Sequence, residues 1–353
     1  MSSKLPPRIA DKSVKPMNVL LTGGAGYIGS HTAVALLHSG HKVVLYDNLS
    51  NSSDAVLEKL AQITGQPIPF IKGDVRDTER LITTLDAHSM DAVIHFAGLK
   101  AVGESVEKPV DYYANNVQGT ISLLQAMQSA QVKTLVFSSS AAVYGEPQYL
   151  PLDENHPTKA TNPYGRSKLH IEEMLNDVAE SGPDWRIVCL RYFNPVGAHE
   201  SGLIGDSPNG VPNNLMPYIA QVATGQRKEL SVFGSDYPTE DGTGVRDYIH
   251  VMDLAEGHVA ALSFLHRTTG WNAVNLGTGQ GYSVFDMVQT FQNASGREVP
   301  YKVIARRAGD VAACYAEPKK ATELLNWSAT RTLHDMCAST WRFQQAQGSR
   351  FAS

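Results

Sequence analysis

The chain has 353 residues and a mass of 38.3 kDa, of which 42% are apolar and 18% charged. This length indicates two domains or one large α/β unit with a cap, and this composition excludes a disordered or fibrous protein. The net charge of -5 argues against general affinity for nucleic acid or anionic membranes, because both require a surplus of basic residues.

The cysteines and the chain ends carry further expectations. Cys189, Cys314 and Cys337 are far apart and form no Cys-x-x-Cys pair, so we expect reduced thiols, no metal site and a cytoplasmic location. No apolar run reaches the ~18 residues that a membrane span needs. Residues 1–16 lack the apolar segment of a secretory signal, so we expect a mobile extension there and a tail at 346–353.

Short apolar runs alternate with helix-period stretches through the first half of the chain. The predicted strands are residues 17–21, 42–46, 69–72, 92–96, 134–137 and 186–191, and the clearest helices are 30–38, 110–128 and 164–180. Strands that alternate with helices form βαβ units around a parallel sheet. The sequence therefore predicts a doubly wound, Rossmann-like α/β domain over residues 17–194.

The pattern changes after Asn194. Residues 195–212 hold four Gly and three Pro, which indicates a long loop that leaves the sheet. Short helix and strand signals follow as far as Trp341. We expect residues 195–345 to form mainly a smaller α/β domain that binds substrate, and the sequence leaves open that some of its segments return to the first domain.

A glycine-rich turn follows the first predicted strand. Residues 22–29 read TGGAGYIG and open a helix. Glycines in such a turn let the backbone approach a pyrophosphate, and the helix N-terminus adds free N–H groups. We therefore expect Gly23, Gly26 and Gly29 to bind a dinucleotide. Asp47 ends the next strand, where a carboxylate accepts ribose hydroxyls and repels a 2′-phosphate, which favours NAD over NADP.

Two later strand ends carry further candidates for this cofactor. Asp74 follows the third predicted strand, and Ala97 and Gly98 follow the fourth. A dinucleotide lies across the carboxyl ends of the strands in such a sheet. We expect Asp74 at the adenine amine and the backbone of Ala97 and Gly98 close to the cofactor, although each feature alone is equally typical of an ordinary loop.

A tyrosine, a lysine and a serine form the candidate catalytic group. Tyr164 and Lys168 share one face of a predicted helix that starts at Pro163, and Ser140 closes the fifth predicted strand. A tyrosine with a pKa near 10 needs roughly 4 kcal/mol of phenolate stabilisation to act as a base at pH 7. The Lys168 ammonium and a positive nicotinamide ring supply this together. Tyr164 then takes a proton from an alcohol whose oxygen Ser140 holds.

Longer motifs surround these residues. They are LTGGAGYIGSH at 21–31, VIHFAGLKAVGES at 93–105, LRYFNPVGA at 190–198, PNNLMP at 212–217 and DGTGVRDYIH at 241–250. With them, residues 17–345 resemble the extended short-chain dehydrogenase/reductase family, and most narrowly its members that epimerise UDP-galactose and UDP-glucose at C4.

The resemblance implies a redox-neutral isomerase that keeps NAD tightly bound. Tyr164 would deprotonate the sugar 4-hydroxyl, Ser140 would hold the 4-oxygen, and Lys168 would tune Tyr164 and bind the nicotinamide ribose. A transient 4-keto sugar would turn over and be reduced on its opposite face. The resemblance also implies a homodimer; the two helices at 110–128 and 164–180 permit it but also have a sheet to cover.

Contacts carry over by residue from the same resemblance. Besides the glycines, Tyr164 and Lys168, the implied cofactor contacts are Tyr27, Ile28, Asp47, Asn48, Asn51, Ser52, Asp74, Val75, Phe96, Ala97, Gly98, Lys100, Asn115, Ser138 and Phe193. Besides Ser140 and Tyr164, the implied UDP-sugar contacts are Asn194, Asn214, Leu215, Phe233, Arg246, Tyr248, Arg307, Asp310 and Cys314. Guanidinium groups suit a diphosphate, yet Arg246 alone equally suits a surface ion pair with Asp247.

One position bears on substrate breadth. Family members confined to galactose and glucose usually carry a bulky Tyr where this chain has Cys314. The small thiol suggests room for the acetamido group of UDP-N-acetylhexosamines. The alternative is a buried thiol that fills space, with Tyr315 or a loop shift closing the gap.

Three other functions stay in view. A 4,6-dehydratase is disfavoured because Ala141 and Ala142, rather than acids, follow Ser140. A dehydrogenase or reductase that exchanges its cofactor is not excluded by the sequence. A non-catalytic NAD sensor is disfavoured because it has no use for the serine, tyrosine and lysine.

Overall fold

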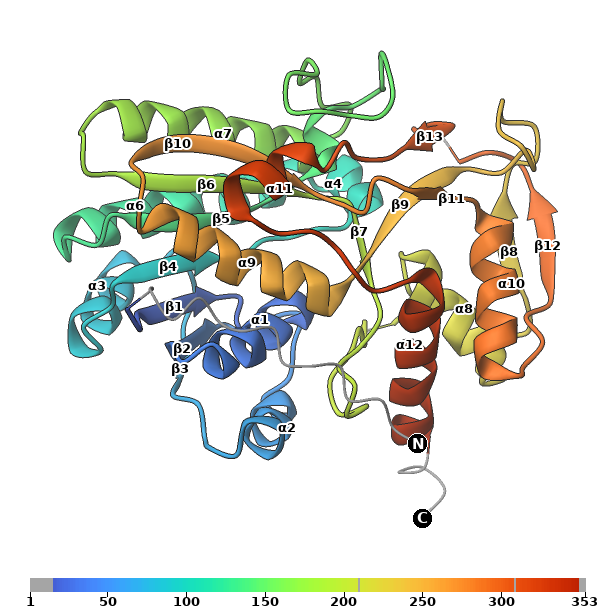
Figure 1. Cartoon of the computed structure of the whole chain (residues 1–353), viewed down its shortest axis with the longest axis horizontal. Coiled ribbons are helices and arrows are strands. Elements are labelled where there is room, and N and C mark those ends of the chain that lie inside the picture. The colour runs from blue at the N-terminus through green and yellow to red at the C-terminus, as the bar shows by residue number, and fades with distance from the viewer. Residues whose placement is uncertain (1–14, 209, 308, 349–353) are drawn as a thin grey trace.

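A seven-stranded parallel sheet forms the centre of the molecule (Figure 1). The computed structural model describes residues 15–208, 210–307 and 309–348. In spatial order the strands are β10 (Gly270–Leu276), β6 (Arg186–Tyr192), β5 (Thr134–Ser140), β4 (Ala92–His95), β1 (Asn18–Thr22), β2 (Lys42–Asp47) and β3 (Phe70–Lys72). The predicted doubly wound fold is confirmed, and all strands end at the edge where such sheets bind ligands.

Helices cover both faces of this sheet. One face carries α1 (Tyr27–His38), α2 (Ala55–Thr64), α9 (Val251–Leu265) and α11 (Lys319–Leu325), and the other carries α3 (Thr78–Ala87), α6 (Gln118–Ser129) and α7 (Pro163–Glu180). Alternate residues of a strand point to opposite faces. Accordingly Val19 and Leu21 of β1 join the first core, whereas Leu20 joins the second.

The segment predicted as one helix over residues 110–128 consists of three pieces. After α4 (Val102–Glu107) come α5 (Pro109–Tyr112), a π-helical turn η1 (Tyr113–Val117) and then α6. The backbone stays helical from Pro109 to Ser129, so the predicted helix is confirmed, whereas the π-turn within it was not predicted. π-turns of this kind are frequent at functional sites, and this one carries Asn115.

A smaller region extends beyond the carboxyl edge of the large sheet (Figure 1). Its sheets join β7 (Asn194–Val196), β9 (Val245–His250), β11 (Gly281–Tyr282) and β13 (Ala313–Cys314), and separately β8 (Leu230–Phe233) and β12 (Tyr301–Ile304). Its helices are α8 (Leu215–Ala223), α10 (Val284–Ser295) and α12 (Leu333–Gly348). Met216, Phe291 and Met336 belong to its separate core.

The two regions are not consecutive along the chain. After β9 the chain returns through α9 and β10 to the large sheet, and α11 also packs there, before α12 joins the smaller region. Helix α12 continues into the range expected as a tail from 346. Residues 1–14 of the expected extension and 349–353 lie outside the described residues. Among the helices of the described ranges, none combines the length and the apolar character needed to span a membrane.

Candidate active site

The glycine turn links β1 to α1 at the carboxyl edge of the sheet. Gly23 has φ +70°, a left-handed conformation that glycine adopts without strain, and a Cβ there would lie 2.7 Å from the Ala97 nitrogen. A Cβ on Gly29 would lie 2.5 Å from the Gly23 carbonyl oxygen. The turn thus requires glycine at both positions, and the backbone surface that it leaves beside the start of α1 fits a dinucleotide pyrophosphate.

Asp47 links the glycine turn by hydrogen bonds to the loop that follows β2. Its nearly buried carboxylate accepts hydrogen bonds from the Ala25 N–H at 3.1 Å, the Leu49 N–H at 2.8 Å and the Ser52 hydroxyl at 3.0 Å. Asn48 donates to Asp74 at 3.1 Å. The structure therefore gathers these predicted cofactor contacts, from the ends of three neighbouring strands, around one turn.

Arg76 also pairs with Asp74. Two of its nitrogens donate to the two carboxylate oxygens at 2.8 and 2.7 Å. Hydrogen bonding by this guanidinium holds the pKa of Asp74 below its usual range. Asp74 is thus an anion and a hydrogen-bond acceptor, as a contact to an adenine amine requires.

The three candidate catalytic side chains come from β5 and α7. Asn162 caps α7, its side chain accepting the Gly165 N–H at 2.8 Å, and Pro163 occupies the first turn. One turn into the helix, the buried Lys168 Nζ donates to the Ser138 carbonyl at 2.6 Å and lies 4.7 Å from the centre of the Phe137 ring. Lys168 is thereby held at the end of β5, the strand that Ser140 closes.

Burial sets the acidities of this group. It raises the pKa of Tyr164, against a smaller opposing effect of a hydrogen bond with Ser140. It lowers the pKa of Lys168 from 10.5 to about 8. The protein alone therefore favours a neutral phenol, and a further positive charge, such as an oxidised nicotinamide, is needed before Tyr164 becomes a base near neutral pH.

A buried hydrogen-bonded chain behind the site was not predicted. The Thr22 hydroxyl lies 2.6 Å from His95 Nδ1, whose Nε2 lies 3.1 Å from Thr120. Asn116, in the π-turn, holds the Leu99 backbone and the Ser167 hydroxyl of α7. Because the Thr120 hydroxyl donates to the Asn116 carbonyl at 2.7 Å, these bonds join the end of β1 to the helix that carries Tyr164. Asn116 directly follows Asn115, and no sequence signal separates their roles.

A buried ion pair also supports the strand ends and was equally missed. Arg191 on β6 donates to Glu172 on α7 at 2.7 Å, and both side chains are at most 5% exposed. Ser139 also donates to Glu172, and Arg191 to the Tyr144 hydroxyl at 3.0 Å. An ion pair between a strand and the helix packed on it leaves no periodic pattern in the sequence.

Strand β9 gathers the candidate diphosphate and sugar contacts. In register, Asn194 of β7 pairs with Tyr248, and Cys314 of β13 pairs with Arg246. The Arg246 guanidinium donates to its neighbouring Val245 carbonyl at 2.8 Å. Asp247 points to the opposite face of the strand and accepts from Thr278, Gly279 and Ala316, so the two neighbours form no surface pair.

A second cluster lies at the end of β8. The Arg307 guanidinium carbon lies 5.4 Å from the centre of the exposed Phe233 ring, and its NH2 group donates to Asp310 at 2.9 Å. An aromatic face, a guanidinium and a carboxylate together suit a nucleoside diphosphate. Asn214 and Leu215 lie at the start of α8, which packs in the same core as β8.

The remaining predicted contacts are more dispersed. Ile28 and Phe96 pack against the core beneath the turn, Val75 and Phe193 are buried, Asn115 is half-buried, and Asn51 and Lys100 are exposed. Tyr27, beside the glycine turn, connects to the loop after β7, because its hydroxyl donates to the Gly197 carbonyl at 2.6 Å. Within residues 15–208, 210–307 and 309–348, no group of three or more His, Cys, Asp or Glu side chains is placed to hold a metal ion.

A glycine turn after β1, an acid after β2 and a Ser-Tyr-Lys group on β5 and α7 define a protein of the short-chain dehydrogenase/reductase class. The sequence profile described as GDP-mannose 4,6 dehydratase matches residues 20–340. UDP-glucose 4-epimerases of Bacillus subtilis and Mus musculus are 55% and 57% identical to the chain, over 96% and 95% of it and 99% of each relative. The chain belongs to the UDP-glucose 4-epimerase family.

Solved structures agree with this assignment. A UDP-glucose 4-epimerase from Stenotrophomonas maltophila, crystallised with NAD and formylated UDP-arabinopyranose, is 52% identical with a TM-score of 0.93, over 95% of this chain and 99% of that one. The Bifidobacterium longum enzyme, in complex with NAD+ and UDP, is also 52% identical with a TM-score of 0.91, over 94% and 99%.

Proposed function

We propose that this protein interconverts UDP-galactose and UDP-glucose at C4 and keeps NAD bound throughout. The observation that carries the proposal is that Lys168, one helical turn after Tyr164 on α7, is held at the end of β5, at the same carboxyl edge of the sheet as the glycine turn. Relatives more than 50% identical over nearly the whole chain support it. A homodimer and a cytoplasmic location stay predictions.

The residues at the glycine turn fit NAD. The close backbone approach at Gly23 leaves no room for a side chain, and Asp47 and Asp74 offer carboxylate oxygens to ribose and adenine. When bound, NAD supplies the reversible oxidant for the carbon that bears the alcohol.

The chain's own groups move the proton and hold the sugar. Tyr164 removes the proton of the 4-hydroxyl, while the Lys168 ammonium stabilises the phenolate and Ser140 donates to the 4-oxygen. Arg246 and Arg307 hold the diphosphate, so that the sugar can turn about this anchor and present its opposite face. Tyr164 then returns the proton.

The first test is conversion of UDP-galactose by purified protein without added NAD, followed by the anomeric proton signals in NMR. We expect UDP-glucose to appear without reduced nicotinamide building up. Tyr164→Phe keeps the ring and removes the base, so it should lower kcat at least ~100-fold while NAD remains bound. Absence of UDP-glucose even after NAD is supplied would reject the proposal.

Rival functions give other outcomes in the same experiment. Stoichiometric release of reduced nicotinamide would indicate a dehydrogenase, and NAD occupancy without turnover would indicate a sensor. The dehydratase description of the matching profile is not favoured, because Ala141 and Ala142 in the short helix η2 (Ala141–Val143) offer no acid for elimination.

We also propose that UDP-N-acetylhexosamines are substrates. Cys314 is half-buried and lies in register with Arg246, and its thiol is much smaller than a tyrosine ring. Cys314→Tyr should lower kcat/KM for UDP-N-acetylgalactosamine at least ~10-fold, by steric exclusion of the acetamido group, and leave UDP-galactose within about threefold. Equal kcat/KM values for the N-acetylated sugar in wild type and variant would contradict this.

A further inference from the structure

One of the crossings between the smaller region and the large sheet is made at the buried His250. Strand β9 ends at His250, and α9, which packs against α1, begins at Val251. Helix α1 in turn begins at Tyr27, beside the glycine turn. The contacts of His250 therefore influence the position of the smaller region, the UDP-sugar half of the site, relative to the large sheet, which forms the NAD half.

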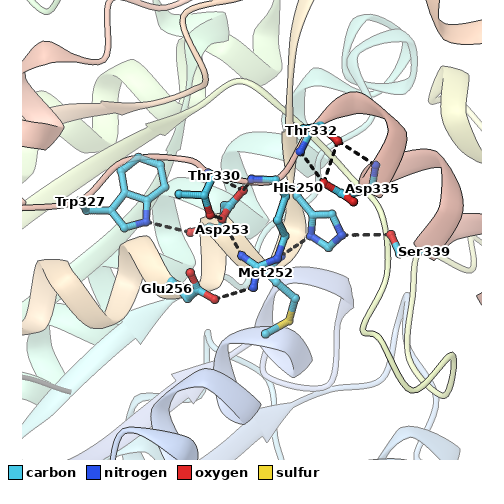
Figure 2. Close-up of polar contacts among 10 residues, drawn as sticks. His250, Met252, Asp253, Glu256, Trp327, Thr330, Thr332, Asp335 and Ser339 are labelled. Carbon is cyan, nitrogen blue, oxygen red and sulfur yellow. Dashed lines mark hydrogen bonds and ion pairs between the residues drawn. The ribbon is translucent and has the colours of Figure 1, made fainter. Parts of the chain in front are cut away.

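The neighbours of His250 determine its protonation. Its Nδ1 accepts the Met252 N–H at 3.0 Å and so caps α9, and its Nε2 lies 3.0 Å from the Ser339 hydroxyl on α12 (Figure 2). Ser339 donates its own proton to the Met336 carbonyl at 3.1 Å, so its oxygen accepts from Nε2–H. The imidazole is thus neutral, and burial lowers its pKa to about 3.

The same serine reaches the cofactor half. Its oxygen also accepts the Ala198 N–H at 3.2 Å, and the preceding Gly197 carbonyl accepts the Tyr27 hydroxyl at 2.6 Å. A Cβ on Gly197 would lie 2.9 Å from His250 Nε2, so the loop packs directly on the imidazole. His250, Ser339 and the Gly197 loop form one hydrogen-bonded unit between α12 and the start of α1.

A second tie fixes the same end of α9. The fully buried Asp253 accepts from the Thr330 N–H at 3.1 Å, and the Trp327 indole donates to the Asp253 carbonyl at 3.1 Å (Figure 2). The Arg331 guanidinium also donates to the Asp253 carboxylate at 2.6 Å. Arg331 also pairs with Glu256 at 2.8 Å. These bonds hold the first turn of α9, so a change at His250 acts mainly on its contacts with Ser339 and the Gly197 loop.

We propose that His250 is a positioning residue that, through Ser339 and the Gly197 loop, holds the UDP-sugar half against the NAD half and so retains the 4-keto sugar until it is reduced. The inference rests on the proposed function. If the halves separate while the sugar is oxidised, the 4-keto sugar leaves, its two electrons stay on the cofactor, and the hydroxyl proton passes from Tyr164 to water. The enzyme is then left with reduced nicotinamide and cannot act on the next UDP-hexose.

Two variants loosen this unit without removing the helix cap. His250→Asn keeps a capping oxygen for Met252 but does not reach Ser339, and Ser339→Ala removes the shared acceptor. His266→Asn and Ser263→Ala, near the other end of α9, are matched controls. For each protein we would measure NAD content, UDP affinity by calorimetry, Tm, kcat, and the near-ultraviolet absorbance of reduced nicotinamide during turnover of UDP-galactose.

We expect NAD content and UDP affinity to match wild type, because each half still binds its own ligand. Reduced nicotinamide should accumulate roughly tenfold faster in both variants, with progressive loss of activity, whereas the two controls should behave as wild type. UDP-galactose turnover by wild type at the same time reports on the proposed function.

Three results would overturn the proposal. Variants that accumulate reduced nicotinamide no faster than wild type would show that the unit does not retain the intermediate. A loss of kcat that only follows a lower Tm would show a purely structural role. A wild-type protein that does not convert UDP-galactose would overturn the proposed function and this inference together.

Discussion

At the scale of single residues, burial of the Lys168 ammonium lowers the stability of the folded protein. Burial lowers its pKa from 10.5 to about 8. Between pH 8 and pH 10.5 the unfolded chain binds the proton that the folded protein has released, so stability rises with pH across this window. Below pH 8 the full penalty of burying the ammonium is present.

Lys168→Met should therefore be more stable and inactive. At pH 7 the free energy of unfolding should rise by about 2 kcal/mol, after allowance for the lost hydrogen bond to the Ser138 carbonyl, and the gain should vanish near pH 10.5. Urea unfolding at both pH values measures this, with Lys133→Met as the partly exposed control. A variant less stable than wild type at pH 7 would contradict the sign.

At the scale of elements, the turn between β1 and α1 depends on close backbone contacts. A Cβ on Gly29 would lie 2.5 Å from the Gly23 carbonyl oxygen and 2.8 Å from the Gly24 Cα, and neither backbone atom can move without opening the turn. The seven-stranded sheet does not depend on this contact. A side chain at position 29 should therefore distort the turn and the NAD site while the fold is retained.

Gly29→Ala should lose NAD while it remains folded. We expect the purified variant to contain at least ~10-fold less NAD, with wild-type far-ultraviolet circular dichroism, because the displaced turn no longer offers its N–H groups. Gly103→Ala in α4, where a Cβ meets nothing within 4 Å, is the control and should keep its NAD. Full NAD content in Gly29→Ala would refute the assignment of this turn.

At the scale of the whole molecule, one surface suits the predicted homodimer. Val102, Val106 and Val110 on α4 and α5 are 47%, 64% and 75% exposed, and both helices pack beside α7. Exposed apolar side chains that recur every four residues on neighbouring helices are typical of an interface. A two-fold axis would place this surface against its own copy.

Val106→Asp should shift the protein to a monomer. Burying two symmetry-related carboxylates in an interface is costly, so we expect the dissociation constant to rise at least ~100-fold. Sedimentation velocity at micromolar concentration measures the change, and Val303→Asp on β12, which is 45% exposed, is the control. Wild-type protein that sediments as a monomer would remove the dimer prediction altogether.

Local spacing in the sequence is enough to predict several parts of the site. The glycine turn, Asp47 and the pair Tyr164 and Lys168 are each specified within a few residues by a strand end or a helical turn, and the structure places them at one edge of the sheet. The π-turn at 113–117 was not predicted, because one inserted residue leaves the apolar pattern nearly unchanged.

Contacts between segments far apart in the chain could not be predicted from the sequence. Asn116 and Ser167 are 51 residues apart, and Ala198 and Ser339 are 141 apart, yet each pair shares a buried hydrogen bond. The helical period of α9 shows that one of its faces is buried but does not say against which sheet. Such contacts depend on the path of the whole chain, because a polar side chain finds its partner only after the layers around it have packed.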